Sequence, residues 1–562
     1  MEQPTHNRPR IFSLAAISIA TLATHWMALI NEGLVAEDWG LFPALLYKDW
    51  TSITDLLAST GMPVFSLYAW PMTLVVNVFL YKAIFFLAIY FIAVLAYLIG
   101  VRSGYLTDRE ALMVAIFSQL LPIATITTVF SYAMYFNAYV LFLWASYLFV
   151  GLETTRGIRH FTMRGVSLGL YFLAFSLNSL LVLYGGAFVL VYLVRLRMGG
   201  RQVRHLREVL DTFIGFCKTR IDFMLFPFLY WAWKRIFTPR SGQYSNYNTL
   251  EFVPGRIAMD AYHFVSDGFV IPLAKSFGPT NPYMLLAAAI YVALFVWMVL
   301  KFSARTNRPS DTERVEGRSA WAMVGFGFLL FLGGAAPYIL VGKSPEPGVL
   351  MRNAMLIPLP LSVMLVGTWR VLKSKLVGIV TDNAATVALL ILLVPFTVRW
   401  WDNYAAWQAR TAKDIAITQY LAENSQWANF SVYWIEDKFP LKGSDDEHGF
   451  QEYTARFRML WGGQTRMAFT PPHEAFFGID SPRGVRPVHS KFPERLSYFC
   501  SNWSSSRNID LTGPQAELGI APGPNASTNE AIAFDFLYFR FIKPDGLHDY
   551  LGKLAGVTLR PL

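Results

Sequence analysis

The sequence is poor in charged residues and almost without cysteine. Asp, Glu, Lys and Arg together make up 15% of its 562 residues, whereas soluble domains have roughly 25%. Hydrophobic residues make up 54% of the chain, which excludes a water-soluble surface for most of it and makes lipid the expected solvent. The two cysteines, Cys217 and Cys500, fall in segments predicted on opposite sides of the bilayer, so no disulfide framework is expected.

The chain also lacks an internal repeat, a heptad pattern and a low-complexity segment. Transporters commonly consist of repeated halves and carry ionisable residues near the bilayer centre, so these absences disfavour transport. The formal net charge of +10 would suggest nucleic acid binding in a soluble protein, but the basic residues stand in short segments between apolar runs. We interpret them as determinants of membrane topology and expect no nucleic acid partner.

What the sequence does contain is a series of apolar runs. A helix crosses the hydrocarbon layer of about 30 Å with about 20 residues. The first run lacks a small-residue cleavage site, so it is expected to be a retained helix rather than a signal peptide. A turn at 177–179 separates two short runs, for which one kinked helix or a re-entrant pair is the alternative. The predicted spans are 11–30, 83–99, 111–127, 138–151, 166–178, 180–194, 223–233, 283–300, 320–340, 354–368 and 384–398.

Basic residues decide the predicted orientation. The segments 1–10, 100–110, 152–165, 195–221, 301–319 and 369–378 hold 22 Lys and Arg, against nine in the loops on the other side. Because positively charged loops stay in the cytoplasm, the N-terminus is predicted inside and, after an odd number of spans, everything beyond Arg399 outside. The sequence thus predicts an all-α transmembrane bundle of about eleven helices in residues 1–399, followed by a small soluble α/β domain in 400–562.

Three predicted outside segments are long. Loop 31–82 contains the stretch LFPALLYKDWTSITDLL, whose apolar residues recur at helical spacing, as in a helix that lies on the membrane surface. Loop 234–282 is rich in Tyr, Asn and Gly. In the tail, aromatic residues precede a predicted helix that ends near Asn424, and the runs at 430–435 and 531–542 are typical of strands.

Two adjacent carboxylates, Glu37 and Asp38, stand just beyond the first predicted span. Beside apolar surface, partial desolvation and the neighbouring like charge raise the pKa of at least one of them. A carboxylate with a raised pKa can act as a general base. The alternative is that both are solvated loop residues or cap the following helix.

The arrangement of the chain resembles the GT-C class of membrane glycosyltransferases. The shared features are a first helix, a long outside loop with an acidic motif and an interfacial helix, many further spans, and an outside soluble domain; the motif match is the Glu37-Asp38 pair. The resemblance implies that an acidic residue of the first loop deprotonates the acceptor hydroxyl. It also implies a polyprenyl-phosphate sugar as donor, with its lipid tail in the bilayer. By analogy the base is Asp38 or Glu37, with Asp38 preferred.

Inverting sugar transfer also requires positive charge where the phosphate departs. Lys343 and Arg352 flank the motif SPEPGVLM in the short outside loop before the tenth span. Arg352 is the better candidate because a guanidinium can bind phosphate through two hydrogen bonds, and because the helix start predicted at Asn353 also favours an anion. Snorkelling of both side chains to the membrane interface is the alternative.

Candidate sugar contacts lie in loop 234–282. Tyr244 and Asn248 belong to the run SGQYSNYN and can stack on a sugar and bond its hydroxyls, unless the run is an ordinary turn-rich loop. His263 and Asp267, four residues apart on a predicted helix, offer two metal ligands, which do not make a site by themselves; a structural role is the alternative. His25, inside the first span, is expected to pack between helices rather than to react.

The hypothesis from the sequence is an inverting glycosyltransferase of the bacterial inner membrane, with its N-terminus cytoplasmic and its C-terminus periplasmic. It would move a sugar from a polyprenyl phosphate to a cell-envelope glycan, lipid or protein acceptor on the outer side. The alternatives are a polymerase or ligase that uses polyprenyl-diphosphate oligosaccharides, and a transporter or flippase for lipid-linked glycans. No cofactor is expected: paired carboxylates can hold Mg²⁺ or Mn²⁺, but Arg352 can neutralise a phosphate instead, so no metal is assigned.

Overall fold

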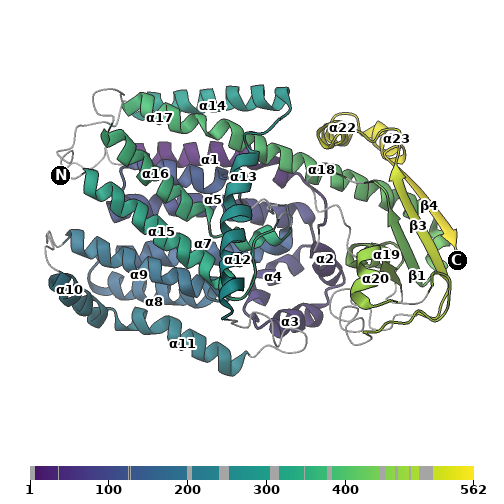
Figure 1. Cartoon of the computed structure of the whole chain (residues 1–562), viewed down its shortest axis with the longest axis horizontal. Coiled ribbons are helices and arrows are strands. Elements are labelled where there is room, and N and C mark those ends of the chain that lie inside the picture. Colours follow the sequence, from purple (N-terminus) through teal and green to yellow (C-terminus); the bar gives the residue numbers. More distant parts are fainter. Residues whose placement is uncertain are drawn as a thin grey trace.

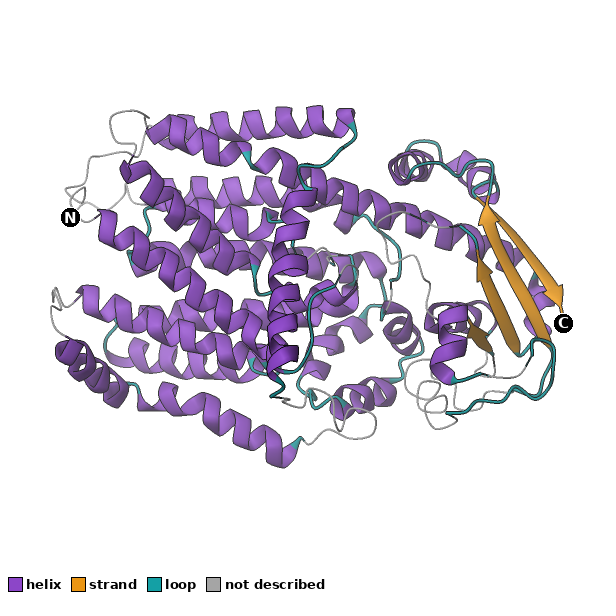
Figure 2. Cartoon of the chain, in the orientation of Figure 1, coloured by secondary structure: helices purple, strands orange, loops and turns teal. Residues whose placement is uncertain are grey.

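The structure is a computed structural model of the whole chain. It describes residues 7–35, 37–123, 126, 128–198, 206–238, 252–303, 316–346, 349–375, 382–439, 441, 450–462, 466–479, 482–492 and 511–562. These residues are mostly helical, with a small mixed sheet near the C-terminus (Figures 1 and 2). The N-terminus and the sheet lie at opposite ends of a bundle of roughly parallel helices, and we call the end that faces the sheet the domain end.

Long helices make up the bundle. Six stretches of the described residues are long and apolar enough to cross a membrane, as expected of a membrane protein; they are Ile11–Leu29, Val78–Ser103, Phe130–Gly151, Ser179–Met198, Pro282–Lys301 and Ala320–Leu340. The total of eleven spans stays a prediction. The bundle helices are α1 (Asn7–Leu29), α5 (Val78–Ser103), α6 (Asp108–Leu120), α7 (Ala133–Gly151), α8 (Gly157–Ala174), α9 (Ser179–Met198), α10 (Leu206–Thr219), α11 (Ile221–Phe237), α14 (Pro282–Ser303), α15 (Glu316–Leu340), α16 (Pro358–Lys375), α17 (Asp382–Ile391) and α18 (Leu393–Glu423).

The predicted runs at 166–178 and 180–194 form two separate helices, α8 and α9, rather than one kinked helix. The chain turns between Ala174 and Ser179. The rings of Tyr171 and Tyr184 then meet edge to face, with their centroids 4.8 Å apart. Contact between rings 13 positions apart in sequence requires the two helices to fold back on each other, since one straight helix would separate them by about 20 Å.

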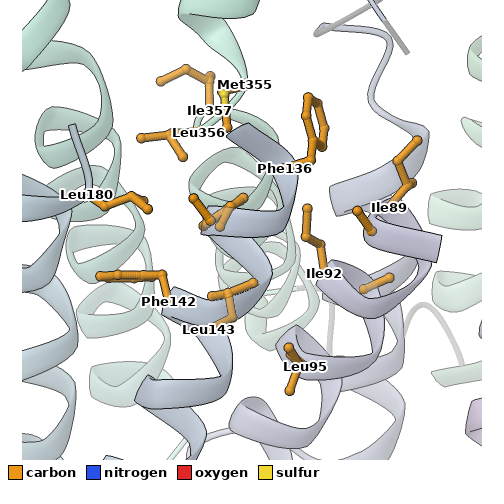
Figure 3. Packing of buried hydrophobic residues seen from close by; sticks show 14 of the residues in the cluster. Ile89, Ile92, Leu95, Phe136, Phe142, Leu143, Leu180, Met355, Leu356 and Ile357 are labelled. Carbon is orange, nitrogen blue, oxygen red and sulfur yellow. The ribbon is translucent and has the colours of Figure 1, made fainter. Parts of the chain in front are cut away.

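Buried apolar side chains from helices that are distant in the sequence form the core of the bundle. Figure 3 shows side chains of α5, α7 and α9 packed near residues 355–357, which precede α16. The labelled side chains are Ile89, Ile92, Leu95, Phe136, Phe142, Leu143, Leu180, Met355, Leu356 and Ile357. This packing fixes the chain just before α16, which carries Arg352, against the first turns of α7, which Tyr132 immediately precedes.

Short helices gather at the domain end (Figure 1). The first loop folds into α2 (Asp38–Leu46), α3 (Trp50–Ser59) and α4 (Phe65–Leu74), where one interfacial helix was predicted. Asp49 caps α3 by accepting the backbone N–H of Ser52 at 3.1 Å. From the later loop, α12 (Pro254–Val265), the π-helix η3 (Ser266–Val270) and α13 (Ile271–Lys275) run across the bundle helices.

The C-terminal part is a small mixed α/β domain. Its sheet has the order β2-β1-β3-β4, with β1 parallel to β2 and β3, and β4 antiparallel to β3. α18 runs from the bundle through residues 399–400 into this domain without a break. The strands and helices are β1 (Val432–Asp437), α19 (Phe450–Trp461), β2 (Met467–Phe469), α20 (Pro471–Phe477), β3 (Gln515–Pro522), α22 (Asn529–Phe541), α23 (Leu547–Gly552) and β4 (Ala555–Pro561).

Two strand predictions for this domain had different outcomes. The run at 430–435 overlaps β1, so that prediction is confirmed within two residues. The run at 531–542 was wrong, because it forms α22, which begins after the cap Thr528. The reason is that α22 is apolar on both faces: Ile532 and Phe536 are buried, whereas Phe534 and Tyr538 are exposed. A helix without a polar face shows no 3.6-residue period.

Candidate functional site

Glu37, Tyr132 and Arg352 meet at the domain end of the bundle. Glu37 immediately precedes α2, Tyr132 ends the 3-10 turn η1 (Phe130–Tyr132) before α7, and Arg352 lies in the 3-10 segment η5 (Val349–Ala354) before α16. The guanidinium of Arg352 is ion-paired with the Glu37 carboxylate. The Tyr132 hydroxyl donates to Glu37 Oε2 at 2.5 Å and accepts from Arg352 Nη1 at 2.5 Å, so each of the three side chains contacts the other two.

This cluster is only partly shielded from solvent. The side chains of Glu37 and Arg352 are 21% and 24% exposed. The Arg352 guanidinium also sits over the Tyr132 ring, with Cζ 5.2 Å from the ring centroid. A guanidinium stacked on an aromatic ring keeps N–H groups directed outward in one plane, which suits an oxyanion with two acceptor oxygens.

Asp38 lies beside the cluster and is fully buried. Its carboxylate accepts backbone N–H bonds from Val35 at 3.2 Å, Phe130 at 3.2 Å and Ser131 at 2.8 Å. Burial raises the pKa of Asp38 to about 6, although the Lys82 ammonium and the N–H donors act in the opposite direction. At least one carboxylate of the pair was expected to have a raised pKa, and this environment raises the pKa of Asp38.

The buried cation next to Asp38 is Lys82, in the second turn of α5. Its side chain is buried, and the ammonium donates to the carbonyl of Thr128. Residues 128–131 therefore bind both charged groups, because Thr128 accepts from Lys82 while the N–H groups of Phe130 and Ser131 donate to Asp38. A buried carboxylate and a buried ammonium near one another compensate each other's desolvation.

Of the other candidates from the sequence, Lys343 and His263 lie in described segments, whereas Tyr244 and Asn248 do not. Lys343 stands just after α15, and its backbone N–H donates to Tyr338. The next residue, Ser344, donates to Asp260 of α12 at 3.0 Å and accepts from Asn353 at 3.3 Å. Asn353 adjoins Arg352, so the loop of Lys343, η5 and α12 are joined through hydrogen bonds.

His263 is paired within its own helix segment. Its Nδ1 lies 2.7 Å from Asp267 Oδ2, a contact that the spacing of four residues on a helix allows. Across the part of the chain that the structure describes, no group of three His, Cys, Asp or Glu side chains is placed to hold a metal ion. Tyr244 and Asn248 lie outside the described residues.

A small cavity lies between helices of the bundle, and its lining includes Met355, three residues after Arg352, and Phe136, four residues after Tyr132. The space open to the centres of water-sized spheres is about 40 Å³, several times the roughly 10–15 Å³ needed for one water. Phe136 and Tyr139, which line it, follow Tyr132 on one face of α7 at spacings of four and seven residues. The lining residues are His25, Ile89, Ile92, Ser118, Gln119, Leu121, Phe136, Tyr139, Met355, Pro358, Leu359 and Trp400.

His25 packs between helices, as the sequence analysis expected. It is fully buried, with Nδ1 at 2.5 Å from the Tyr404 hydroxyl and Nε2 at 3.2 Å from the Gln119 carbonyl. A hydroxyl donor and a carbonyl acceptor are both satisfied by a neutral imidazole protonated on Nε2. His25 therefore joins α1 to α6 and α18 and forms part of the cavity wall.

Sequence reasoning missed Tyr132 and Lys82. Lys82 had a signal, because it is a single basic residue at the edge of a long apolar run, and ionisable residues in such positions are often functional. Tyr132 had none, since tyrosine is frequent in this chain and nothing local distinguishes it. Comparison of the chain with protein-family models, with curated proteins and with solved structures gives no match, so function has to be argued from the cluster itself.

Proposed function

We propose that this protein is an inverting glycosyltransferase of the GT-C type, which moves a sugar from a polyprenyl phosphate to a cell-envelope acceptor on the outer side of the membrane. The observation that carries the proposal is the contact between Glu37 and Arg352, with the buried Asp38 beside it. It brings an anion-binding group and a carboxylate of raised pKa together at one end of a membrane bundle. These are the two groups that displacement of a lipid phosphate by a hydroxyl requires.

At the anomeric carbon the reaction makes one bond and breaks one. The acceptor hydroxyl oxygen attacks the anomeric carbon, the bond from that carbon to the phosphate oxygen breaks, and the hydroxyl proton passes to a carboxylate. The polyprenyl phosphate leaves with the electron pair of the broken bond, and its added negative charge faces the Arg352 guanidinium. A fixed cation placed where this charge develops lowers the barrier without reorganisation during the reaction.

The two carboxylates then take different roles. Glu37 bonds Arg352 and Tyr132, so it orients the guanidinium and occupies the position that a phosphate oxygen takes when the donor binds. Asp38, whose pKa burial raises to about 6, has the basicity that suits a general base near neutral pH. Since Asp38 is enclosed by residues 128–131, binding of the acceptor has to move that segment aside.

The cavity and the position of the domain agree with this assignment. A phosphate on Arg352 would place the first units of its lipid tail toward the apolar wall formed by Phe136, Met355 and Leu359. The N-terminus and the C-terminal domain lie at opposite ends of the bundle (Figure 1), as they would with a cytoplasmic N-terminus and a periplasmic domain in a bacterial inner membrane. In the proposed topology the acidic pair and the domain share the outer compartment.

One observation favours a second function. The buried Asp38 and Lys82 lie where a membrane span meets the first loop, and buried ionisable groups at such depths also mark transport pathways. Transport of a lipid-linked glycan would need both groups but no acceptor, so the formation of a glycosylated product distinguishes the proposed transfer from transport. A polymerase or ligase differs from the proposed enzyme in its donor, which carries a diphosphate instead of a monophosphate.

The deciding experiment supplies purified protein in lipid with radiolabelled polyprenyl-phosphate sugars and an extract of envelope acceptors. We expect acceptor-bound label with wild type, loss of about 1,000-fold or more with Asp38→Asn, and a smaller loss with Glu37→Gln. If neither substitution reduces transfer, the base assignment is wrong. If label moves only from polyprenyl-diphosphate donors, the polymerase or ligase replaces the present proposal.

A further inference from the structure

The segment that carries Glu37 and Asp38, residues 31–47, is held by the C-terminal domain ahead of the two carboxylates. Asn31 donates to Gln408 Oε1 at 2.8 Å and to Thr411 Oγ1 at 3.0 Å, both on α18. Glu32 is paired with Arg540 of α22 at 2.9 Å. The approach is close at Gly33, where a Cβ atom would lie 2.1 Å from Thr411 Oγ1, so a larger residue would push the segment away from α18.

The same segment is held again after the carboxylates, by α19. The guanidinium of Arg456 lies over the ring of Trp39, with Cζ 4.9 Å from a ring centroid. Just after α2 ends, Tyr47 donates to the Arg458 carbonyl at 3.3 Å, and the Arg458 guanidinium lies 4.8 Å from the Tyr47 ring centroid. The chain therefore has contacts to the domain on both sides of Glu37 and Asp38, which are themselves bound by residues of the bundle.

Arg456 is itself buried and ion-paired. Its side chain is 1% exposed, and Nη2 lies 2.5 Å from Asp414 Oδ1 on α18. A second buried pair, Arg410 with Glu452 at 2.7 Å, also links α18 to α19. Stacking of a guanidinium on an indole ring strengthens when both groups leave water, so Arg456 transmits the position of α18 and α19 to Trp39, the residue next to Asp38.

We propose that the C-terminal domain positions the candidate carboxylates, and that Arg456 is the positioning residue that acts through Trp39. The bundle supplies Arg352, Tyr132 and Lys82, whereas the domain fixes the segment that carries Glu37 and Asp38. This inference rests on the proposed function for its catalytic consequence, but the mechanical contact is independent of any reaction. If residues 31–47 become more mobile, donor binding at Arg352 stays largely intact. Asp38 then spends a smaller share of the time in the position that proton transfer requires.

The test compares backbone amide exchange in residues 31–47 of the full-length protein in lipid nanodiscs. Arg456→Met removes the guanidinium and Arg456→Lys keeps a cation. Arg483→Met is the matched control, because Arg483 also lies over a tryptophan of the domain, Trp434, with Cζ 5.6 Å from the ring centroid. We expect exchange in 31–47 to rise about tenfold in Arg456→Met, less in Arg456→Lys and not in Arg483→Met.

Unchanged exchange in 31–47 of a folded Arg456→Met protein would overturn the proposal. If that variant loosens the whole domain, Trp39→Leu decides, because it removes the ring from α2 and leaves α19 intact. Faster exchange confined to 31–47 in Trp39→Leu supports the contact, and wild-type exchange there overturns it.

In transfer assays we expect the kcat of Arg456→Met to be about tenfold below that of wild type, with the KM for the donor within twofold of the wild-type value. Altered exchange in a protein that transfers no sugar would sink the proposed function alone.

A different observation concerns α22, which presents an apolar stripe. Phe534, Tyr538, Phe541 and Ile542 are 46%, 49%, 57% and 71% exposed. Their spacing of four, seven and eight residues places them on one side of the helix, and Ile532 and Phe536 on the other side are buried in the domain core. Four large exposed side chains on one face of a soluble domain indicate a contact with something apolar.

The position of α22 identifies that contact. Ala533 packs in one cluster with Met284 and Ala288 of α14, which is a membrane span. Met284 and Ala288 belong to the first two turns of α14 at the domain end, where Figure 1 shows α22 beside it. The stripe therefore lies at the level where α14 leaves the bilayer, and the beginning of α14 itself exposes Tyr283 at 81%.

We infer that α22 lies in the headgroup region of the leaflet at the domain end, with its apolar stripe against lipid. The test uses spin labels on a chain with Cys217→Ser and Cys500→Ser, reconstituted into phosphatidylethanolamine and phosphatidylglycerol vesicles. At Tyr538→Cys and Phe534→Cys we expect collisions with oxygen to exceed those with a water-soluble nickel chelate, relative to Asp549→Cys on α23. Equal accessibility profiles at all three positions would overturn the inference.

Discussion

Glu37 and Arg352 are ion-paired across 315 positions of the sequence, and the Tyr132 hydroxyl bonds both. Three separate segments meet there, each at the point where it enters a helix. Because the pair is partly exposed, the guanidinium can exchange its protein carboxylate for the phosphate of a ligand with little loss of hydrogen bonding. The pair thus keeps the guanidinium oriented, and in the proposed reaction this prepares it for the phosphate of the donor.

Arg352→Lys should weaken transfer more than its conserved charge suggests. A lysine ammonium cannot bond two phosphate oxygens in one plane, and it loses the stacking on Tyr132. We expect kcat/KM for the lipid donor to fall about 100-fold, with normal membrane insertion. Initial rates over a range of donor concentrations measure this, and a change of less than about threefold would show that Arg352 does not face the phosphate.

Tyr132→Phe tests the hydroxyl without removing the ring. Arg352 keeps its aromatic neighbour, but Glu37 and Arg352 lose the hydrogen bond that each makes with the hydroxyl. A neutral hydrogen bond to a charged group contributes about 1.5–3 kcal/mol, so we expect a fall in kcat/KM of about tenfold or more. Tyr132→Leu, which removes the stacking as well, should lose more activity, and equal loss in the two variants would contradict the role of the ring.

The pKa of Asp38, raised to about 6, predicts the pH profile. A general base has to be deprotonated, so kcat/KM should be full above this pH and fall about tenfold for each unit below it. The Glu37→Gln variant should retain this limb. Stability should change in the opposite direction: the folded protein holds the proton more tightly than the unfolded chain, so stability decreases as pH rises from about 4 to about 6.

Much of the fold could be predicted because lipid imposes a simple rule on helices. The spans at 283–300 and 320–340 match α14 and α15 within a few residues, since only long apolar runs satisfy the membrane. The strand predicted at 531–542 was wrong because this segment is a helix with a second apolar face, which is directed away from the domain core. The order of apolar residues in the sequence does not show which of them are buried. The start of α5 was placed late, at Ala83, because the cap Asn77 was not recognised.

The site was predictable only in its separate parts. Glu37, Asp38 and Arg352 were selected from chemistry and from their positions at predicted helix ends. The contact between Glu37 and Arg352 depends on the packing of α7 against the chain before α16, and no local pattern encodes a contact between residues 315 positions apart. The enclosure of Asp38 by the N–H groups of Phe130 and Ser131 depends in the same way on a turn that carries no sequence signal.

The predicted topology can be tested at the last residue. With the N-terminus in the cytoplasm, a phosphatase that folds only outside the reducing cytoplasm should be active when fused after Leu562. A green fluorescent protein that requires the cytoplasm should stay dark at the same point. The reverse pair of signals would place Glu37 and Asp38 in the cytoplasm, together with the domain that contacts them, and would exclude transfer on the outer side.

Lys82 provides the sharpest test of Asp38 as the base, because it changes the carboxylate without touching the substrate sites. The Lys82 ammonium lowers the pKa of Asp38 and so offsets part of the effect of burial. In Lys82→Met the carboxylate loses that cation, its pKa rises further, and the rising limb of the pH profile should move to higher pH while the plateau rate stays within about threefold. Lys48→Met, an exposed residue in the same loop, serves as the control and should leave the limb in place. If the limb does not move in a folded Lys82→Met protein, it belongs to a group other than Asp38, and Glu37 becomes the candidate base.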